Sequence, residues 1–435
     1  MTTSPRLSRA TLASTVGTAL EWYDFSLYGT ASALVFAHVF FPSGSALAAT
    51  LASLGTFAVG FFARPIGGIV IGLLGDRFGR RQMLFLTLLL MAAASTAIGL
   101  LPTYGTIGMW APVLLVVLRV LQGIGAGGEY AGAMLLSAEH APGAHRGLNA
   151  SIPSVGNAMG ALLATAVFYL IASVLPHEQF LDWGWRIPFL LSAVLAIAAF
   201  IIRMRVSESP EFEAGTAGTP ARSGREQLGQ VLHRGGRRIP LAMLMSIAPN
   251  VLSYLPSVYA LSYLATQVGV PESVGLIGLL IANALKFFTV PAAGMLSDRF
   301  GGRRIMIIGA LSGAVMMFPF FLLLDTGTPV LVWAAFVLLF TLCCDMTLAS
   351  QATMLSTLFD VDVRYGSVTF SREITGAVIG GGIPFAAAAL TGVLGGEPWL
   401  VVVLCAALCV LCALGTRALP ETRTTARGAD LGAVD

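Results

Sequence analysis

Charged residues are scarce in this sequence: Asp, Glu, Lys and Arg make up 11% of its 435 residues, against about 25% in an average soluble domain. Apolar residues make up 56%, and 49 glycines add to them. So little charge excludes a cytosolic enzyme, because the chain could not cover a surface exposed to water. The length instead suits about twelve transmembrane helices of roughly 20 residues each.

Cysteine is also scarce, and its placement argues against a disulfide or metal framework. The five cysteines all lie in strongly apolar stretches, and no CxxC pair recurs at the spacing of metal ligands. We interpret them as buried apolar side chains, at Cys343, Cys344, Cys405, Cys409 and Cys412. The sequence also shows no nucleophile–base pair and no nucleotide-binding loop, so we expect no enzymatic activity.

Twelve apolar segments are long enough to cross a bilayer. They fall at about 14–40, 47–73, 83–101, 109–137, 148–175, 186–204, 239–266, 273–296, 305–324, 329–355, 366–394 and 398–416. The one long polar stretch lies between the sixth and the seventh. We therefore predict an all-α membrane protein with an N-terminal six-helix bundle at 1–204, a cytoplasmic central loop at 205–237 and a C-terminal six-helix bundle at 238–435.

Positive charge is distributed asymmetrically between the loops. Of 24 arginines and one lysine, 20 fall in the terminal segments, the central loop and the loops on the same side, whereas the opposite loops hold only Arg186. Loops rich in Lys and Arg stay in the cytoplasm. We therefore expect both termini to be cytoplasmic. The other four basic residues lie inside spans.

A short motif occurs twice, once in each predicted bundle. Residues 72–81 read GLLGDRFGRR, and residues 294–304 read GMLSDRFGGRR, at an offset of 222. Each copy follows the second span of its half. A duplicated, parallel six-helix unit is the simplest explanation.

The duplicated loop resembles the signature of the major facilitator superfamily, GxLxDRxGRR between helices two and three. Further segments are similar to its metabolite–proton symporter family, which includes carriers of citrate, 2-oxoglutarate, shikimate, and proline or betaine. They are ALEWYDFSLYG at 19–29, LRVLQGIGAGGEYAGA at 118–133, WRIPF at 185–189, SESPEF at 207–212 and VRYGS at 363–367. The resemblance implies two pseudo-symmetric bundles in the membrane of a bacterium. The fifth span lacks the Gly-Pro pair of drug–proton antiporters, which favours uptake by symport.

Nine charged side chains lie inside the predicted spans. A charge at the bilayer centre costs at least about 2.5–3.5 kcal/mol, so each needs a partner or an aqueous cavity. Spans three, six, nine and twelve have none in their interiors, and in the resembled fold these are the outer helices. The nine are Glu21, Asp24, Arg64, Arg119, Glu129, Lys286, Asp345, Arg372 and Glu373.

Three of the acidic residues are candidates for the coupling proton. Glu21 and Asp24 are three residues apart and share a helical face, in the cytoplasmic third of the membrane with Glu129. Desolvation and mutual repulsion favour proton binding by one of two such carboxylates. We predict that Asp24 or Glu21 carries the proton, with Glu129 as a further candidate. The alternative is that they brace the inner gate by pairing with basic loop residues.

The basic residues are candidates for binding an anionic substrate. Arg119 with Gln122 matches the RxxQG pattern, whose arginine is tied to coupling in the resembled family, although a fixed structural ion pair is the alternative. Lys286 is the one lysine of the chain, and its alternative is a static pair with Asp345 or Glu373. Arg372 is as suited to a gate as to binding, and we interpret Arg64 as structural. Tyr254 and Asn283 could donate hydrogen bonds to a solute in a cavity.

The duplicated loop is a candidate gate. Asp76, Arg77 and Arg81, with Asp298 and Arg299 in the second copy, are predicted to close the inner face as latches that break when the halves rock. We add Glu373 to this gating set because of its place near the cytoplasmic end of its span.

These observations predict a proton-coupled symporter that imports a small organic acid, a mono-, di- or tricarboxylate, by alternating access through the bacterial inner membrane. One alternative is a symporter of a zwitterionic osmolyte such as proline or betaine, because five intramembrane acids outnumber four bases. Another is a transporter-like receptor that senses a solute, which we disfavour because the polar ends are short. We expect a monomer in the lipid bilayer, with the solute and the proton as partners, no nucleic acid, no metal, and no cofactor besides the proton as coupling ion.

Overall fold

The computed structural model describes residues 9–42, 44–78, 80–127, 146–205, 229, 231 and 233–419. Within this part of the chain the regular structure is helical, and no residue lies in a strand. Each long helix coincides with one of the apolar runs, since a backbone in a bilayer must satisfy its hydrogen bonds within the segment.

The N-terminal half consists of six long helices joined by short ones. The long helices are α1 (Arg9–Leu34), α3 (Ala46–Phe78), α4 (Arg80–Leu100), α6 (Trp110–Ala126), α8 (Arg146–Val174) and α10 (Arg186–Arg205). The short connections are α2 (Phe36–Val39), α5 (Tyr104–Ile107), α9 (His177–Gln179) and the π-helical turn η2 (Phe180–Gly184).

The C-terminal half repeats the plan, but three of its spans contain π-helical turns. The seventh span comprises α13 (Arg238–Met245), α14 (Ile247–Tyr254), η3 (Leu255–Tyr259), α15 (Ala260–Tyr263) and η4 (Leu264–Val268). The tenth comprises α18 (Pro329–Leu339), η5 (Phe340–Cys344) and α19 (Asp345–Leu358), and the eleventh α20 (Val361–Thr375), η6 (Gly376–Gly381) and α21 (Gly382–Val393). The continuous helices are α16 (Glu272–Phe300), α17 (Gly302–Asp325) and α22 (Trp399–Ala418). Such turns are frequent at functional sites.

The predicted spans are recovered in the described residues. Eight segments are long and apolar enough to cross a membrane. A ninth is formed by His177–Gly184 together with α10, with a bend of 43° between the two parts. The apolar helices Leu86–Leu100 and Trp110–Ala126 are shorter. The remaining span is α1, which Glu21 and Asp24 make less apolar. The fourth span was predicted to reach residue 137, and its part beyond residue 127 lies outside the described residues.

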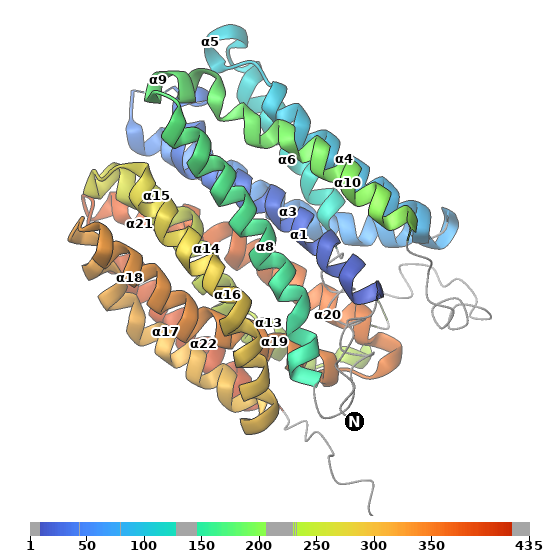
Figure 1. Cartoon of the computed structure of the whole chain (residues 1–435). Coiled ribbons are helices and arrows are strands. Elements are labelled where there is room, and N and C mark those ends of the chain that lie inside the picture. Colours follow the sequence, from blue (N-terminus) through green and yellow to red (C-terminus); the bar gives the residue numbers. More distant parts are fainter. Residues whose placement is uncertain are drawn as a thin grey trace, which may run out of the picture.

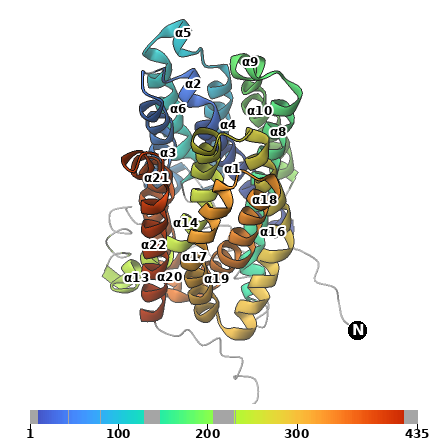
Figure 2. The same cartoon turned by 90° about the vertical axis from the view of Figure 1, so that its left-hand side faces the viewer.

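The two halves lie side by side, and three long helices of the first half contact the second half (Figure 1). The α8 helix packs along α16 and α19, α3 along α20, η6 and α21, and α1 against η3 and α15. The helices that were predicted to be charge-free inside, α4 and α10 on one edge and α17 and α22 on the other, are the outer ones (Figures 1 and 2).

The duplicated motif occupies equivalent positions in the two halves. The α3 helix ends at Phe78 and α4 begins at Arg80, whereas α16 ends at Phe300 and α17 begins at Gly302, which preserves the offset of 222. In the second copy the intervening Gly301 has a φ of 93°, a conformation that other residues rarely adopt. The end of the bundle that carries these two junctions is called the predicted cytoplasmic end below.

Candidate functional site

A central cavity lies between the two halves. It encloses about 540 Å³ of empty space, including open solvent. Its lining comes from α1, α3 and α8 on one side and from α14, η3, α16 and η5 on the other, and it includes Trp22, Asn157, Tyr254, Asn283, Lys286 and Phe340. A cavity shared by both halves at mid-membrane is where an alternating-access carrier binds its solute.

Lys286 is the one charged side chain among the described residues that line this cavity. Its ammonium lies 4.2 Å from the centroid of the Phe340 ring, and only 5% of the residue is exposed. Within the described part of the chain, no carboxylate oxygen lies within 4.0 Å of this ammonium. The static pair that we considered as the alternative is therefore not formed: Asp345 accepts a hydrogen bond from Thr289, and Glu373 binds Arg64.

Arg64 is the counterpart of Lys286 in the first half. Arg64 lies 14 residues before Phe78, the end of α3, and Lys286 lies 14 residues before Phe300, the end of α16. The two residues are therefore related by the same offset of 222 as the loop motif. The internal repeat places a cation at the same depth in each half.

The other cavity residues predicted from sequence are aromatic or neutral. The Tyr254 ring stacks on Trp22 with centroids 6.0 Å apart and an interplanar angle of 13°, and it meets Phe61 edge-on at 4.9 Å. Asn283 also lines the cavity. Sequence reasoning missed Asn157, Ser253 and Ser257, although a polar residue on an apolar span was the available signal.

Arg119 and Gln122 lie inside the first half, outside the lining of the central cavity. Arg119 is fully buried. Its Nη1 donates to Gln122 Oε1 at 2.5 Å, and Gln122 Nε2 donates to Ser95 Oγ at 2.6 Å. The guanidinium lies 4.0 Å from the centroid of the Tyr28 ring. The Nε and Nη2 atoms have no hydrogen-bond partner among the described residues. Neither residue lines the central cavity, and their predicted role in substrate binding or coupling stays a prediction.

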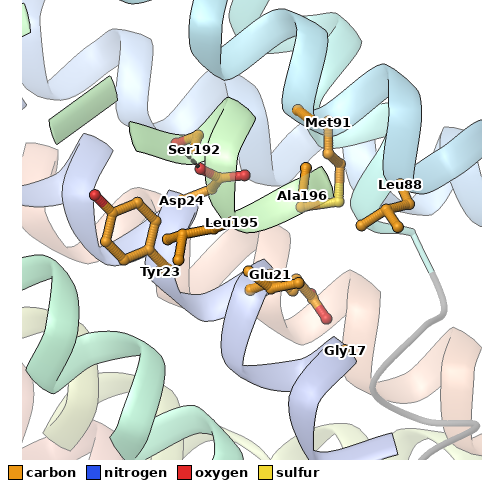
Figure 3. A pocket seen from close by; sticks show the side chains of 11 residues that line it. Gly17, Glu21, Tyr23, Asp24, Leu88, Met91, Ser192, Leu195 and Ala196 are labelled. Atoms are coloured by element: carbon orange, nitrogen blue, oxygen red, sulfur yellow. Dashed lines mark hydrogen bonds between the residues drawn. The ribbon is translucent and has the colours of Figure 1, made fainter. Parts of the chain in front are cut away.

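Asp24 and Glu21 line a second, smaller cavity between α1, α4 and α10, together with Gly17, Met91 and Ser192 (Figure 3). Asp24 is 6% exposed. Ser192, a residue that sequence reasoning missed, donates a hydrogen bond of 2.6 Å to Asp24 Oδ1. Arg119 is close enough to act electrostatically on Asp24. The shared face is thus observed, but the two carboxylates have different partners.

Glu21 belongs to a buried ion-pair cluster that joins the two halves. Arg64 Nη2 lies 2.6 Å from Glu21 Oε1, and Arg64 Nε lies 2.8 Å from Glu373 Oε2. The α3 helix thereby connects to α1 in its own half and to α20 in the other. Arg372 Nη1 lies 3.7 Å from Glu373 Oε1. Arg372 therefore lies in this cluster rather than in the cavity lining, and its predicted role in binding or in gating stays a prediction.

Part of the predicted site lies outside the described residues. This applies to Glu129 and to the side chains of Asp76, Arg77 and Arg81. In the second copy of the motif, Asp298 and Arg299 are exposed at the end of α16, with the Arg299 guanidinium 5.2 Å from the Phe300 ring centroid. The latch function of this motif stays a prediction.

The comparison with known families agrees with this architecture. A model of the family described as "Sugar (and other) transporter" matches residues 10–219 and again residues 219–425, close to one match for each half. The chain belongs to this transporter family. It is therefore a multi-pass membrane transporter of the major facilitator superfamily, as the duplicated motif predicted.

Relatives narrow the group of transporters to which the protein is similar. It is 39% identical over 412 residues to the shikimate transporter of Escherichia coli K12, covering 94% of this chain and 93% of that protein. It is 33% identical over 382 residues to the proline/betaine transporter of the same strain, covering 86% of this chain and 76% of that protein. These relatives are transporters rather than enzymes, which agrees with the expected lack of enzymatic activity.

Solved structures show the same fold. The partially occluded inward-open conformation of the xylose transporter XylE from E. coli matches with a TM-score of 0.75 at 21% identity, over 95% of this chain and 98% of that chain. The proton:xylose symporter XylE bound to 6-bromo-6-deoxy-D-glucose matches with a TM-score of 0.72 at 21% identity, over 96% of both chains. At this identity the likeness concerns the fold alone.

Proposed function

We propose that this transporter is a proton-coupled symporter that imports a small organic acid across the bacterial cytoplasmic membrane, with both termini cytoplasmic. The observation that carries the proposal is Lys286, the one charged side chain among the described residues that line the central cavity. A substrate carboxylate would supply the counter-charge that the described residues do not place within 4.0 Å of its ammonium.

The environment of Lys286 strengthens its attraction for an anion. Its ammonium is nearly buried and lies against the Phe340 ring. Coulomb attraction grows as the effective dielectric constant falls, and a charge-assisted hydrogen bond is about twice as strong as a neutral one. Its counterpart Arg64 binds two carboxylates. The equivalent position in the first half thus already acts as a carboxylate-binding cation.

The rest of the lining suits an acid that also carries hydroxyl or keto groups. Asn157 and Asn283 offer amide donors and acceptors, and Ser253 and Ser257 offer hydroxyl groups. The similarity to a transporter whose name specifies shikimate, a hydroxylated acid, supports this substrate class.

Asp24 is our candidate for the residue that carries the coupling proton. It is buried in the first half, borders the smaller cavity and lies near Arg119. Glu21 is engaged by Arg64, so we assign it to the gate with Glu373. Inward movement of a proton is favoured by about 2.3 kcal/mol per 100 mV of membrane potential.

Contacts between the halves support alternating access. At the predicted cytoplasmic side of the cavity, Arg64 and Glu373 join α3 to α20. Toward the other end, the Leu47 side chain of α3 packs onto Gly392 of α21. Opening on one side requires the contact on that side to separate, which is the expected behaviour of a rocking-bundle transporter.

A zwitterionic osmolyte is the second candidate substrate, and one observation favours it. The stacked pair of Trp22 and Tyr254 borders the same cavity as Lys286. Aromatic faces attract quaternary ammonium groups, so the pair could hold the cationic end of a betaine whose carboxylate meets Lys286. The similarity to a proline/betaine transporter supports this alternative.

Uptake by proteoliposomes tests the proposal and separates the candidates. A panel of radiolabelled shikimate, citrate, 2-oxoglutarate, proline and glycine betaine is presented with an imposed pH gradient, acid outside. We expect accumulation of a carboxylic acid that collapses with a protonophore and is lost in Lys286→Gln. Accumulation of betaine or proline alone would select the osmolyte. Binding of a solute without uptake would contradict symport and support a solute receptor.

A further inference from the structure

Asp345 is a buried carboxylate next to the central cavity that the proposed function does not use. It is fully buried at the start of α19. The Thr289 hydroxyl of α16 donates a hydrogen bond to its Oδ2. Its Oδ1 is also buried and accepts no hydrogen bond from the described residues. One of its two oxygens is therefore unsatisfied in this structure.

Lys286 is the cation whose charge acts on Asp345. It lies three residues before Thr289 on α16 and acts electrostatically on Asp345, although no ion pair within 4.0 Å is formed. The other titratable groups that act on this site are the thiols Cys343 and Cys344 of η5, and Ser253 of α14 contacts the Cys344 sulfur at 3.3 Å. Lys286 is thus the charged partner that the described surroundings offer to Asp345.

An ionised carboxylate with an unsatisfied buried oxygen is strongly unfavourable in a low-dielectric interior. Two changes would relieve it. The Lys286 ammonium could leave the Phe340 ring and pair with Asp345, or a proton could bind to Asp345 and neutralise it. Which change occurs depends on whether Lys286 is occupied by another carboxylate.

We propose that Asp345 is a second proton-binding site, located in the C-terminal half, and that the substrate carboxylate competes with it for Lys286. In the empty transporter the Lys286 ammonium moves from the Phe340 ring, against which this structure places it, and pairs with ionised Asp345. When a substrate carboxylate binds Lys286, Asp345 loses its counter-charge and takes up a proton, forming a neutral carboxylic acid. The proposal rests on the proposed function, because it needs a carboxylate substrate at Lys286.

The charge balance of this exchange predicts how many protons are taken up with the substrate. One anionic carboxylate enters the cavity and one proton enters with it at Asp345, so the charge near Lys286 is the same before and after binding. This uptake is independent of Asp24, which lies on α1 in the other half, lines the smaller cavity with α4 and α10, and accepts a hydrogen bond from Ser192. We expect about one proton to be taken up for each substrate carboxylate bound.

Calorimetry measures this proton directly. Purified full-length protein in lipid nanodiscs is titrated with shikimate, or with the carboxylate of the uptake panel that binds best, in two buffers of different ionisation enthalpy at one pH. The difference in binding heat gives the number of protons taken up. We expect about one in the wild type and in Asp24→Asn, and none in Asp345→Asn, which still binds the carboxylate.

An infrared difference spectrum provides a readout that does not depend on the folding of Asp345→Asn. On substrate binding, the wild type and Asp24→Asn are expected to gain the carbonyl band of a protonated carboxylic acid. If the wild type binds the carboxylate with no proton uptake and no such band, the proposal is overturned while the proposed function stays intact. Unchanged proton uptake on substrate binding in folded Asp345→Asn would have the same meaning. If no carboxylate binds, or if binding is unaffected in Lys286→Gln, the proposed function and this inference fail together.

Discussion

Glu373→Gln should open the predicted cytoplasmic side of the transporter. The Arg64–Glu373 ion pair is buried and joins α3 to α20, with Nε and Oε2 2.8 Å apart. It exists only while the halves are closed on this side. The other partner of Arg64, Glu21, lies in the same half as Arg64 and stays with it when the halves separate. The substitution therefore weakens the closed state selectively.

The size of the effect follows from the charge that is lost. Glutamine keeps the shape and an oxygen acceptor for Arg64 Nε, and the hydrogen bond stays charge-assisted on the Arg64 side. The substitution therefore removes only the attraction between two opposite charges. The closed state should lose about 1–2 kcal/mol, which corresponds to a shift of about 5–30-fold in the ratio of closed to open molecules.

Double electron–electron resonance between spin labels measures this ratio. Ile201→Cys on α10 and Ala418→Cys on α22 place exposed labels near the predicted cytoplasmic end of each half, and the five native cysteines are buried. We expect Glu373→Gln to increase the population with the longer distance. The matched control is Glu397→Gln, which removes an exposed carboxylate beyond the other end of α21. Equal distance distributions for Glu373→Gln and the wild type would refute the gate.

Three further substitutions test separate parts of the account. Gly60→Ala would place a Cβ 2.2 Å from Arg119 Nε, so we expect it to lower the stability of the protein by about 1–3 kcal/mol and to reduce coupled uptake. The control is Gly55→Ala, whose Cβ would meet its nearest neighbour at 3.8 Å and which should leave thermal unfolding and uptake unchanged. Gly301→Ala places a side chain on a residue with a φ of 93° and should lower the stability measured by thermal unfolding by about 1–2 kcal/mol. Gly382→Ala, whose Cβ would meet nothing within 4 Å, should leave stability unchanged. Equal losses of stability in the two variants would contradict the conformational argument. Asp24→Asn should abolish the solute accumulation that is driven by a pH gradient and should retain carboxylate binding in calorimetry. The control is Asp325→Asn, at a carboxylate that accepts a hydrogen bond from Tyr263, and it should retain accumulation. Full accumulation in Asp24→Asn would show that Asp24 does not carry the coupling proton.

The fold could be predicted because the features that determine it can be read directly along the sequence. Apolar runs, the distribution of arginine and the repeat at an offset of 222 predicted the spans and the duplication, and the junctions at Phe78–Arg80 and Phe300–Gly302 agree with them. The same repeat relates Arg64 to Lys286, a correspondence that was present in the sequence but was not extracted from it.

The side-chain partners could not be predicted in this way, since they depend on the rotation of each helix about its axis. Arg64 and Glu373 are 309 residues apart in sequence, and no local pattern links them. Arg119 is directed to Tyr28 and Gln122 rather than into the central cavity. Ser192 was missed because nothing in the sequence relates it to Asp24, from which it is 168 residues away.

The central claim, that Lys286 binds the carboxylate of the transported solute, is tested most directly by a double cycle of ligand and protein. Binding of the transported acid and of its neutral carboxamide is measured by calorimetry in the wild type and in Lys286→Gln, with Lys286→Arg as the charge-preserving control. We predict that the wild type and Lys286→Arg prefer the acid over the amide by at least about tenfold, equivalent to 1.4 kcal/mol, and that this preference disappears in Lys286→Gln. A preference for the acid that persists unchanged in Lys286→Gln would contradict the account.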